Sequence, residues 1–419
     1  FAMKLRALLA GVFLSLVLVA VQAEAVASAK PVAVASGVTY ELIGSYDKVR
    51  LDKITSSELA SFMASSTEPD AFAGKFAPAK YGVKLYRVTY RSVVPELRNR
   101  PTVASGLVAI PENGVRGAQT LPVVSYQHGT VFDKSWVPSN PDSSAETRIM
   151  IAAFAAQGYV VIGADYFGRG ISDLPDSYLV KRSTQQAAYD MLVAANDVLK
   201  AQQVTPGQLF VSGWSQGGWG TMVFLQRLEE LGVKVAAAAA ASVPVDVYLT
   251  INRWMGNPQP IDAVYLPGCA ALQLQAQEYY LQQGGLTESA INPQYLAASR
   301  AFYAGKMSWE DFYKATGPKL TGFMRPEFVA AGAIGTAPYW QVLQDNQAYR
   351  WKSVTPLRAY IGGSDEVTPE YIGKLPEATQ ALLGGAPATT INAGAKADHR
   401  GVFIFGVLDQ KVWFDSLLK

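Results

Sequence analysis

The sequence is poor in the residues that build disulfides and metal sites. Cys269 is its only cysteine, and His128 and His399 are its only histidines. One cysteine excludes an internal disulfide, and two histidines without a cysteine cluster leave too few ligands for a transition-metal site. We therefore expect no metal, and a core large enough to stabilise the chain without cross-links.

The sequence also lacks an excess of charge of either sign. It has 36 Lys and Arg against 34 Asp and Glu, and loss of Lys4 and Arg6 with an N-terminal leader would leave 34 of each. A balanced chain lacks the electrostatic signature of nucleic-acid binding or of attraction to an anionic membrane. Neither partner is expected, and nothing in the sequence indicates an oligomeric state.

One long apolar run stands at the N-terminus. Residues 7–21 are apolar or small, follow Lys4 and Arg6, and precede the small-residue site Val21–Ala23. The run is shorter than the roughly 20 residues that a membrane span needs. The pattern predicts a signal peptide over residues 1–23, no stable membrane span after its cleavage, and a secreted or periplasmic protein. A retained membrane anchor is the alternative.

Apolar runs alternate with helical patterns over residues 80–247. The expected strands are 81–90, 102–110, 121–126, 159–164, 208–212 and 233–245. Helical spacing is expected at 145–157, 184–200 and 219–231. This alternation predicts an α/β fold, with a mostly parallel central sheet that begins with an antiparallel hairpin and is flanked by helices. Ligand sites in such sheets lie at the carboxyl ends of the strands.

The alternation stops at residue 248 and resumes near residue 352. Residues 248–351 are mainly helical and rich in aromatic side chains, which predicts a cap inserted before a later strand at 357–361. The expected division is therefore a signal peptide at 1–23, an N-terminal extension at 24–79, a first part of the core at 80–247, the cap at 248–351 and a second part of the core at 352–419.

The most informative motif is GWSQG at Gly213–Gly217. It follows an apolar strand pattern and precedes a helical one, the context of a nucleophile elbow, in which a sharp strand-to-helix turn exposes the serine hydroxyl. Ser215 is therefore the candidate nucleophile.

A serine hydroxyl needs a base, and the base needs a carboxylate to orient it. His399 is the one histidine downstream of Ser215 and is expected in a loop at 394–400, before a closing helix at 402–418. Asp365 follows a predicted strand and is the candidate acid. Glu366 is the second choice and is expected to point away, while Asp398 is too close in sequence to His399 to bond its ring.

Backbone N–H groups must also stabilise the oxyanion that forms during acyl transfer. We expect these donors at Gln216, which follows the nucleophile, and at Thr130, whose hydroxyl could add a bond. His128 is a competing base but fits a loop-shaping role better. Asp165 and Tyr166 are expected to shape the next loop.

Four motifs together resemble the α/β-hydrolase superfamily and, more narrowly, the secretory lipase family of the yeast lipase A type. They are Gln127–Thr130, Asp165–Gly170, Gly213–Gly218 and Gly363–Val367. The resemblance covers most of residues 80–419. It implies hydrolysis of acyl esters, including lipids, without a cofactor, with Ser215 as nucleophile and Asp365 and His399 as its relay.

The sequence leaves three functions open. The first is an exported serine esterase or lipase that acts on a small-molecule, lipid or polymeric ester through an acyl-enzyme. The second is an exopeptidase-like serine peptidase, which would need carboxylates to bind a substrate amino group; Glu310 and Asp311 are the only adjacent pair in the cap. The third is a non-catalytic binding protein on the same fold.

Overall fold

A single mixed β-sheet runs through the protein. The computed structural model describes residues 30–114, 117–335 and 337–418, so the predicted signal peptide at 1–23 lies outside the described residues. The ten strands have the order β1-β2-β3-β4-β6-β5-β7-β8-β9-β10. Strands β1 to β4 are antiparallel, β4 pairs antiparallel with β6, and β5 to β10 are mutually parallel. The predicted α/β architecture is confirmed.

The strands lie mostly where the apolar runs predict them. Their bounds are β1 Val32–Ala35, β2 Val38–Tyr46, β3 Gly82–Val94, β4 Arg100–Glu112, β5 Gln119–Gln127, β6 Val160–Ala164, β7 Val204–Trp214, β8 Ala237–Ala241, β9 Leu357–Ile361 and β10 Ala388–Asn392. The antiparallel part is larger than a hairpin, because β1 and β2 come from residues where no strand is predicted. The β8 strand is shorter than predicted.

The helices divide into those that cover the sheet and those that form a separate layer. Those around the sheet are α2 Lys48–Lys53, α3 Leu59–Met63, α4 Ala145–Phe154, α5 Lys181–Ala201, α6 Gln216–Glu230, α14 Glu370–Gly373, α15 Leu375–Leu383 and α16 His399–Leu417. The separate layer contains α7 Val247–Gly256, α8 Leu266–Tyr280, α9 Leu286–Ala290, α10 Pro293–Tyr303, α11 Trp309–Thr316, α12 Pro326–Ile334 and α13 Pro338–Asp345.

Two hydrophobic cores lie on the two faces of the sheet. One contains α5 and α6, and the other contains α4, α16 and the N-terminal helices. The all-alanine strand β8 shows the division: Ala238 and Ala240 belong to the first core, whereas Ala237, Ala239 and Ala241 belong to the second. Side chains alternate between faces along a strand, so each helix layer buries one half of β8.

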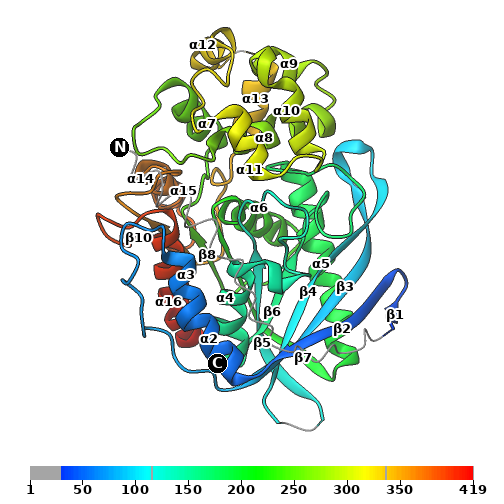
Figure 1. Cartoon of the computed structure of the whole chain (residues 1–419). Helices are drawn as coiled ribbons and strands as arrows, with labels where there is room; N and C mark the ends of the chain where they lie inside the picture. The colour runs from blue at the N-terminus through cyan, green and yellow to red at the C-terminus, as the bar shows by residue number, and fades with distance from the viewer. Residues whose placement is uncertain (1–29, 115–116, 336, 419) are drawn as a thin grey trace.

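Helices α7 to α13 lie at one end of the sheet, above α6 and β8 (Figure 1). The parallel strands point toward this layer, so it covers the carboxyl ends where Trp214, Ala241 and Ile361 lie. We refer to residues 247–351 as the cap.

The N-terminal segment packs beside the last helix of the chain. Helices α2 and α3 lie next to α16 in Figure 1, although more than 300 residues separate them in sequence. The α3 region reaches α16 through Phe62, whose ring meets Phe403 with centroids 5.9 Å apart. The segment is thus part of the folded core and lies near the start of α16.

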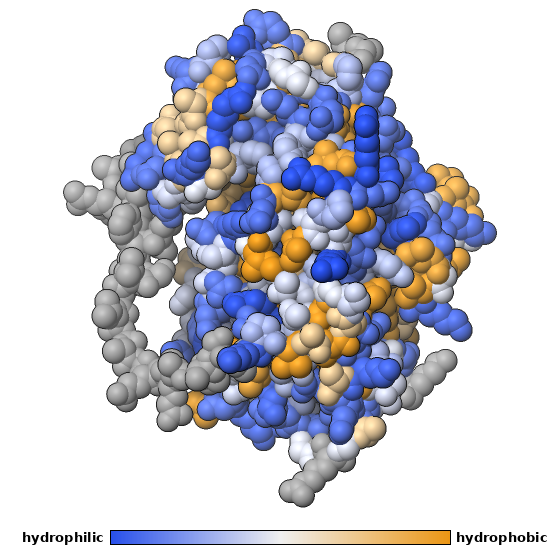
Figure 2. Space-filling view, turned by 90° about the vertical axis from the view of Figure 1, so that its right-hand side faces the viewer, coloured by the Kyte–Doolittle hydropathy of each residue, from blue (hydrophilic) through white to orange (hydrophobic). Residues whose placement is uncertain are grey.

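The surface carries apolar side chains in separate patches. Figure 2 shows the face at the right of Figure 1, where apolar areas alternate with polar ones. Exposed apolar side chains on the elements of that side include Val32 of β1 and Val193 of α5. Within the described residues, no helix combines the length and apolar character that crossing a membrane requires.

Candidate active site

Ser215 occupies a strained turn between β7 and α6. Its backbone has φ 59° and ψ −123°, a conformation that a residue with a side chain adopts only when its surroundings hold it there. Its N–H donates to the Ala241 carbonyl at 2.9 Å, which ties the turn to the end of β8. The structure therefore places the predicted nucleophile on the predicted strand-turn-helix element.

Close backbone approaches explain the glycines on either side of Ser215. A Cβ on Gly213 would lie 2.1 Å from the Gly217 carbonyl oxygen. A Cβ on Gly217 would lie 1.9 Å from the Gln127 oxygen and 2.6 Å from that of His128. Only glycine fits at both positions, and the second contact presses the loop after β5 against the start of α6.

His399 and Asp365 are hydrogen-bonded, as the sequence predicts. His399 Nδ1 lies 2.9 Å from Asp365 Oδ1, and both side chains are buried. The same carboxylate oxygen accepts the N–H groups of Val367 and Thr368, each at 2.9 Å. This turn fixes the carboxylate at the carboxyl end of β9 before it meets the imidazole.

The electrostatics of the pair favour its charged form. Burial alone would lower the pKa of His399, but the carboxylates of Asp365 and its neighbours outweigh burial and raise it. Burial alone would raise the pKa of Asp365, but the charge and hydrogen bond of His399 outweigh this effect and lower the pKa of Asp365. The positively charged imidazolium form of His399 is therefore stabilised by the carboxylates around it.

His399 is the first residue of α16 rather than part of the preceding loop, which corrects the prediction for residues 394–400. Asp398 caps the helix by accepting the Gly401 N–H at 2.8 Å. Asp398 also accepts hydrogen bonds from Ser66 Oγ at 2.8 Å and from the Thr67 N–H at 2.7 Å. It does not bond the ring, as expected, but it anchors the N-terminal segment to the helix that carries the base.

Glu366 contacts the histidine on its backbone. The sequence predicts that this side chain points away, yet its Oε2 accepts the His399 N–H at 2.9 Å. The ring still bonds Asp365 and not Glu366, so the choice between the two neighbouring carboxylates agrees with the structure, whereas the expected orientation of Glu366 is wrong.

Trp214 connects the nucleophile to the base. Its ring lies 4.9 Å from that of His399, and its Nε1 donates to the His399 carbonyl at 3.0 Å. Phe62 of the N-terminal segment packs on the same indole, at 6.1 Å between ring centroids. The middle residue of the Gly213–Ser215 turn therefore holds the start of α16 in place.

The predicted oxyanion donors belong to two segments that pack against each other at the elbow. Gln216 is the first residue of α6, and an N–H in the first turn of a helix has no partner within the helix. Thr130 follows the Gln127–Gly129 loop that packs against Gly217. Its hydroxyl lies 3.0 Å from the Tyr178 hydroxyl, a partner that sequence reasoning missed.

His128 is buried in the loop and away from the Asp365–His399 pair. Its ring nitrogens face the carbonyls of Gly129, at 2.7 Å, and Asp165, at 3.3 Å. Its ring stacks on Tyr166 at 4.3 Å. Burial lowers the pKa of His128 to about 4, so the imidazole is neutral and shapes the loop, as expected.

Asp165 and Tyr166 shape the next loop. Asp165 Oδ2 accepts from Ser105 Oγ at 2.5 Å, and Asp165 Oδ1 accepts from the Ser139 N–H at 2.9 Å. The Tyr166 hydroxyl donates to the His128 carbonyl at 3.2 Å. Both side chains support the loop that carries Thr130.

Glu146 is a buried carboxyl group that the sequence did not single out. It lies on α4 and accepts hydrogen bonds from the Gly129 N–H at 2.8 Å and from the Tyr126 hydroxyl. Burial raises the pKa of Glu146 to about 8. No local sequence signal distinguishes it from an ordinary surface glutamate near a helix N-terminus, because its environment comes from β5 and the loop after it.

The cap places aromatic rings close to this loop. Phe132, two residues after Thr130, stacks on Trp309 with ring centroids 4.6 Å apart. Tyr265 meets Phe132 at 6.4 Å, and its neighbour Ala263 bonds the Glu366 carbonyl at 3.0 Å. The cap segment that carries Tyr265 thus contacts both the oxyanion loop and the turn that carries Asp365.

The cap leaves little of the site exposed. Ser215 is 9% exposed, Asp365 7% and His399 3%. A cavity of about 570 Å³ lies elsewhere, lined by Gly207, Lys234 and Val354. These residues stand at the amino ends of the parallel strands, so the cavity is at the opposite end of the sheet from Ser215.

Among the described residues, no group of three or more histidine, cysteine, aspartate or glutamate side chains has a geometry suited to a metal ion. The carboxyl groups around His399 are instead bonded to N–H and hydroxyl groups of the chain.

A mostly parallel sheet, a strained serine after its central strand and a histidine–aspartate pair at the same edge define the α/β-hydrolase fold. The chain has this fold. Its residues 145–266 also match the model of the prolyl oligopeptidase family. That segment includes Ser215 but ends before Asp365 and His399.

Solved structures agree on the fold. A protein of Legionella pneumophila described as a hydrolase superposes with a TM-score of 0.78 at 21% identity, covering 90% of this chain and 97% of that one. The rice cell wall degrading esterase LipA of Xanthomonas oryzae gives 0.75 at 20% identity, with 91% and 97% covered. Lipase A of Candida antarctica in its closed state gives 0.61 at 17% identity, with 80% and 77% covered. A comparison with curated protein sequences gives no match.

Proposed function

We propose that this protein is an exported serine hydrolase that cleaves carboxylic esters through an acyl-enzyme. The observation that carries the proposal is the His399–Asp365 hydrogen bond of 2.9 Å beside the strained elbow of Ser215. A bonded Nδ1 leaves Nε2 of His399 as the nitrogen that accepts a proton.

The reaction follows from these roles. Ser215 Oγ adds to the ester carbonyl carbon while its proton passes to His399. The N–H groups of Gln216 and Thr130 stabilise the oxyanion, each contributing a rate factor of about 10²–10³. The intermediate then releases the alcohol, which takes the proton from His399. Water, activated by the same histidine, hydrolyses the acyl-enzyme and restores Ser215.

The aromatic side chains of the cap favour a substrate that carries an apolar acyl group or an aromatic group. Phe132, Tyr265 and Trp309 form an aromatic cluster next to the oxyanion loop, and apolar surface of this kind gains affinity for a ligand by being removed from water. The esterase and lipase neighbours are consistent with this substrate class.

Initial rates on p-nitrophenyl esters of two to sixteen carbons, with Ser215→Ala as control, test the proposal. We expect turnover that Ser215→Ala abolishes. A maximum at long chains would indicate a lipase, and a maximum at two to four carbons would indicate a hydrolase of small or aromatic esters. Turnover that survives in Ser215→Ala would refute the mechanism.

A peptidase is the second candidate, because residues 145–266 match the prolyl oligopeptidase family model. The carboxylate pair that could bind a substrate amino group does not support it, since Glu310 and Asp311 are exposed on α11 and Asp311 bonds Ser308 and Lys314. Turnover of p-nitroanilides by the wild type, lost in Ser215→Ala and without ester turnover at any chain length, would favour the peptidase.

A further inference from the structure

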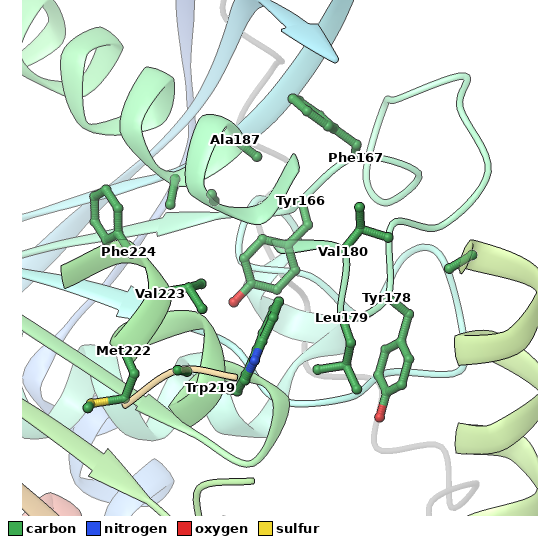
Figure 3. Packing of buried hydrophobic residues seen from close by; sticks show 14 of the residues in the cluster. Tyr166, Phe167, Tyr178, Leu179, Val180, Ala187, Trp219, Met222, Val223 and Phe224 are labelled. Carbon is green, nitrogen blue, oxygen red and sulfur yellow. The ribbon is translucent and has the colours of Figure 1, made fainter. Parts of the chain in front are cut away.

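Tyr178 has a hydroxyl group that is buried between the oxyanion loop and the cap. It lies in the loop between β6 and α5, is 4% exposed, and contacts Thr130 Oγ1 at 3.0 Å. On its other side it interacts with the thiol of Cys269 on cap helix α8. Figure 3 shows Tyr178 next to Leu179, at the edge of the core that also holds Tyr166 and Trp219. The proposed reaction has so far assigned it no role.

The three side chains can form a chain of hydrogen bonds in which each group donates to the next. Burial raises the pKa of Tyr178 well above 10 and that of Cys269 to about 12, so both groups keep their protons. A thiol is a weak donor and a weaker acceptor than a hydroxyl. Either hydroxyl can be the donor in the 3.0 Å contact; donation from Tyr178 to Thr130 Oγ1, with the thiol directed at the tyrosine oxygen, is the arrangement that the proposal below requires. This arrangement leaves the Thr130 proton free for a third group.

The backbone around Tyr178 is held in place by the cap. Leu179 has φ 54°, which is unfavourable for a leucine. Its carbonyl accepts hydrogen bonds from Asn346 Nδ2 at 2.9 Å and from Gln277 Nε2 at 3.4 Å, both in the cap. Asn346 is itself bound through its carbonyl to Trp219 Nε1 of α6 at 2.8 Å. Cap contacts therefore fix the position of the Tyr178 hydroxyl.

We propose that Tyr178 is a positioning residue that turns the Thr130 hydroxyl into the oxyanion hole, so that Thr130 donates a side-chain hydrogen bond in addition to its N–H. When Ser215 Oγ adds to the ester carbonyl and its proton moves to His399, the carbonyl oxygen becomes negative and accepts the Thr130 proton as a hydrogen bond. Each donor in the series Cys269, Tyr178, Thr130 strengthens the next. The inference rests on the proposed function.

The test compares Tyr178→Phe with Thr130→Val and with the double variant. We expect Tyr178→Phe to lower kcat on the best p-nitrophenyl ester about tenfold, less than the loss of a whole oxyanion donor, with KM little changed. Affinity for an aliphatic trifluoromethyl ketone, which adds to Ser215 and carries an oxyanion, should fall by the same factor. In the Thr130→Val background, Tyr178→Phe should have no further effect on either quantity.

Tyr159→Phe is the matched control. It also removes a hydroxyl from a buried tyrosine, here one that bonds Asp415 at 2.8 Å at the amino end of β6, and it should leave kcat unchanged. If Tyr178→Phe does not fold, Cys269→Ser and Cys269→Ala replace it: the serine variant, with the stronger donor, should exceed the alanine variant in kcat about two- to threefold. That ratio should vanish in the Thr130→Val background.

Several outcomes would overturn the inference. One is an unchanged kcat in Tyr178→Phe, and another is a loss that persists at full size in the Thr130→Val background. A rise in KM alone would assign Tyr178 to packing. If Ser215→Ala is inactive while Tyr178→Phe equals the wild type, only the positioning role of Tyr178 fails. If Ser215→Ala stays active, the proposed function fails with it.

Discussion

The base side of the candidate site, around His399, and the oxyanion side, around Thr130, differ in the charge of their titratable groups. On the base side, three carboxyl groups, those of Asp365, Glu366 and Asp398, surround His399 and raise its pKa. On the oxyanion side, burial favours the neutral form of three titratable groups around Thr130. Burial lowers the pKa of His128 to about 4 and raises that of Glu146 to about 8 and that of Tyr178 well above 10.

The difference matches the charges that ester hydrolysis would create. An imidazolium forms on one side, and nearby carboxylates stabilise it. A negative oxygen forms on the other side, where any fixed negative charge in a buried site would oppose it. The ion pair of Arg169 with Asp176, at 2.6 Å, carries no net charge, and its guanidinium donates to the carbonyl of Val131, the residue after Thr130. The site thus separates groups that attract a cation from groups that tolerate an anion.

Removing the central carboxylate of the base side should have the largest effect. Asp365→Asn places an amide opposite Nδ1, which favours the wrong tautomer of His399 and removes the charge that stabilises the imidazolium. We expect kcat to fall about 10⁴-fold, measured on the best p-nitrophenyl ester. Glu366→Gln, whose side chain bonds the backbone and not the ring, is the control and should lose far less. Equal losses of kcat in the two variants would mean that the orientation of the His399 ring does not explain the effect of Asp365→Asn.

The neutrality of Glu146 predicts a descending limb in the pH profile. Activity should rise with pH as His399, with its raised pKa, loses its proton above pH 6.5. It should fall above about pH 8, where Glu146 ionises beneath Gly129. Glu146→Gln cannot ionise and should keep its activity at pH 9. A wild type and variant with superimposable profiles above pH 8 would contradict this explanation.

The same residue should affect stability in a defined pH window. In the unfolded chain Glu146 ionises near its ordinary value of 4.5, but in the folded chain near 8. A raised folded pKa contributes stability that is complete below pH 4.5 and is lost as the pH rises toward 8. Thermal unfolding should therefore show Glu146→Gln gaining stability over the wild type between pH 5 and 8, with a constant difference above that range.

Asp398→Asn should lower the pKa of His399 without disturbing the hydrogen bond between His399 and Asp365. Asparagine caps a helix about as well as aspartate, so α16 keeps its start, while the charge that helps raise the pKa of His399 is lost. The ascending limb of kcat/KM should move to lower pH, and the plateau should fall far less than in Asp365→Asn, since Asp365 still bonds the ring of His399. Asp415→Asn, near the far end of α16, is the control and should leave the pH profile of kcat/KM unchanged. An ascending limb that is not shifted in Asp398→Asn would rule out the charge effect.

The cap should affect selectivity more than chemistry, and this is the smallest expected effect. Trp309→Ala removes the ring that stacks on Phe132, a pair worth about 0.5–1.5 kcal/mol beyond its buried area. We expect KM for long or aromatic acyl groups to rise up to about tenfold, while turnover of the acetyl ester is unchanged. A loss on all esters alike would show that Trp309 supports the fold and not a pocket.

The elements most accessible to sequence reasoning were those defined by local spacing. The apolar run at Leu357–Ile361 gave a strand with those bounds, and Gly213–Gly217 gave the elbow. Errors arose where a distant segment decides the outcome. Residues 30–46 form two strands because β3 offers a free edge, and His399 begins a helix because Asp398 caps it while Ser66 and Thr67 hold Asp398.

The sequence by itself determined the mixed sheet with its capped edge, the serine at a strand-to-helix turn, and the order of the candidate nucleophile, acid and base, because apolar periodicity and turn residues act over a few positions. The tertiary structure decided how Glu366 and Asp398 hold the backbone around the base, that Glu146 is neutral, and that Thr130 meets Tyr178. Protonation and hydrogen-bond partners depend on burial, and burial at each of these positions is produced by segments that lie far away in the chain.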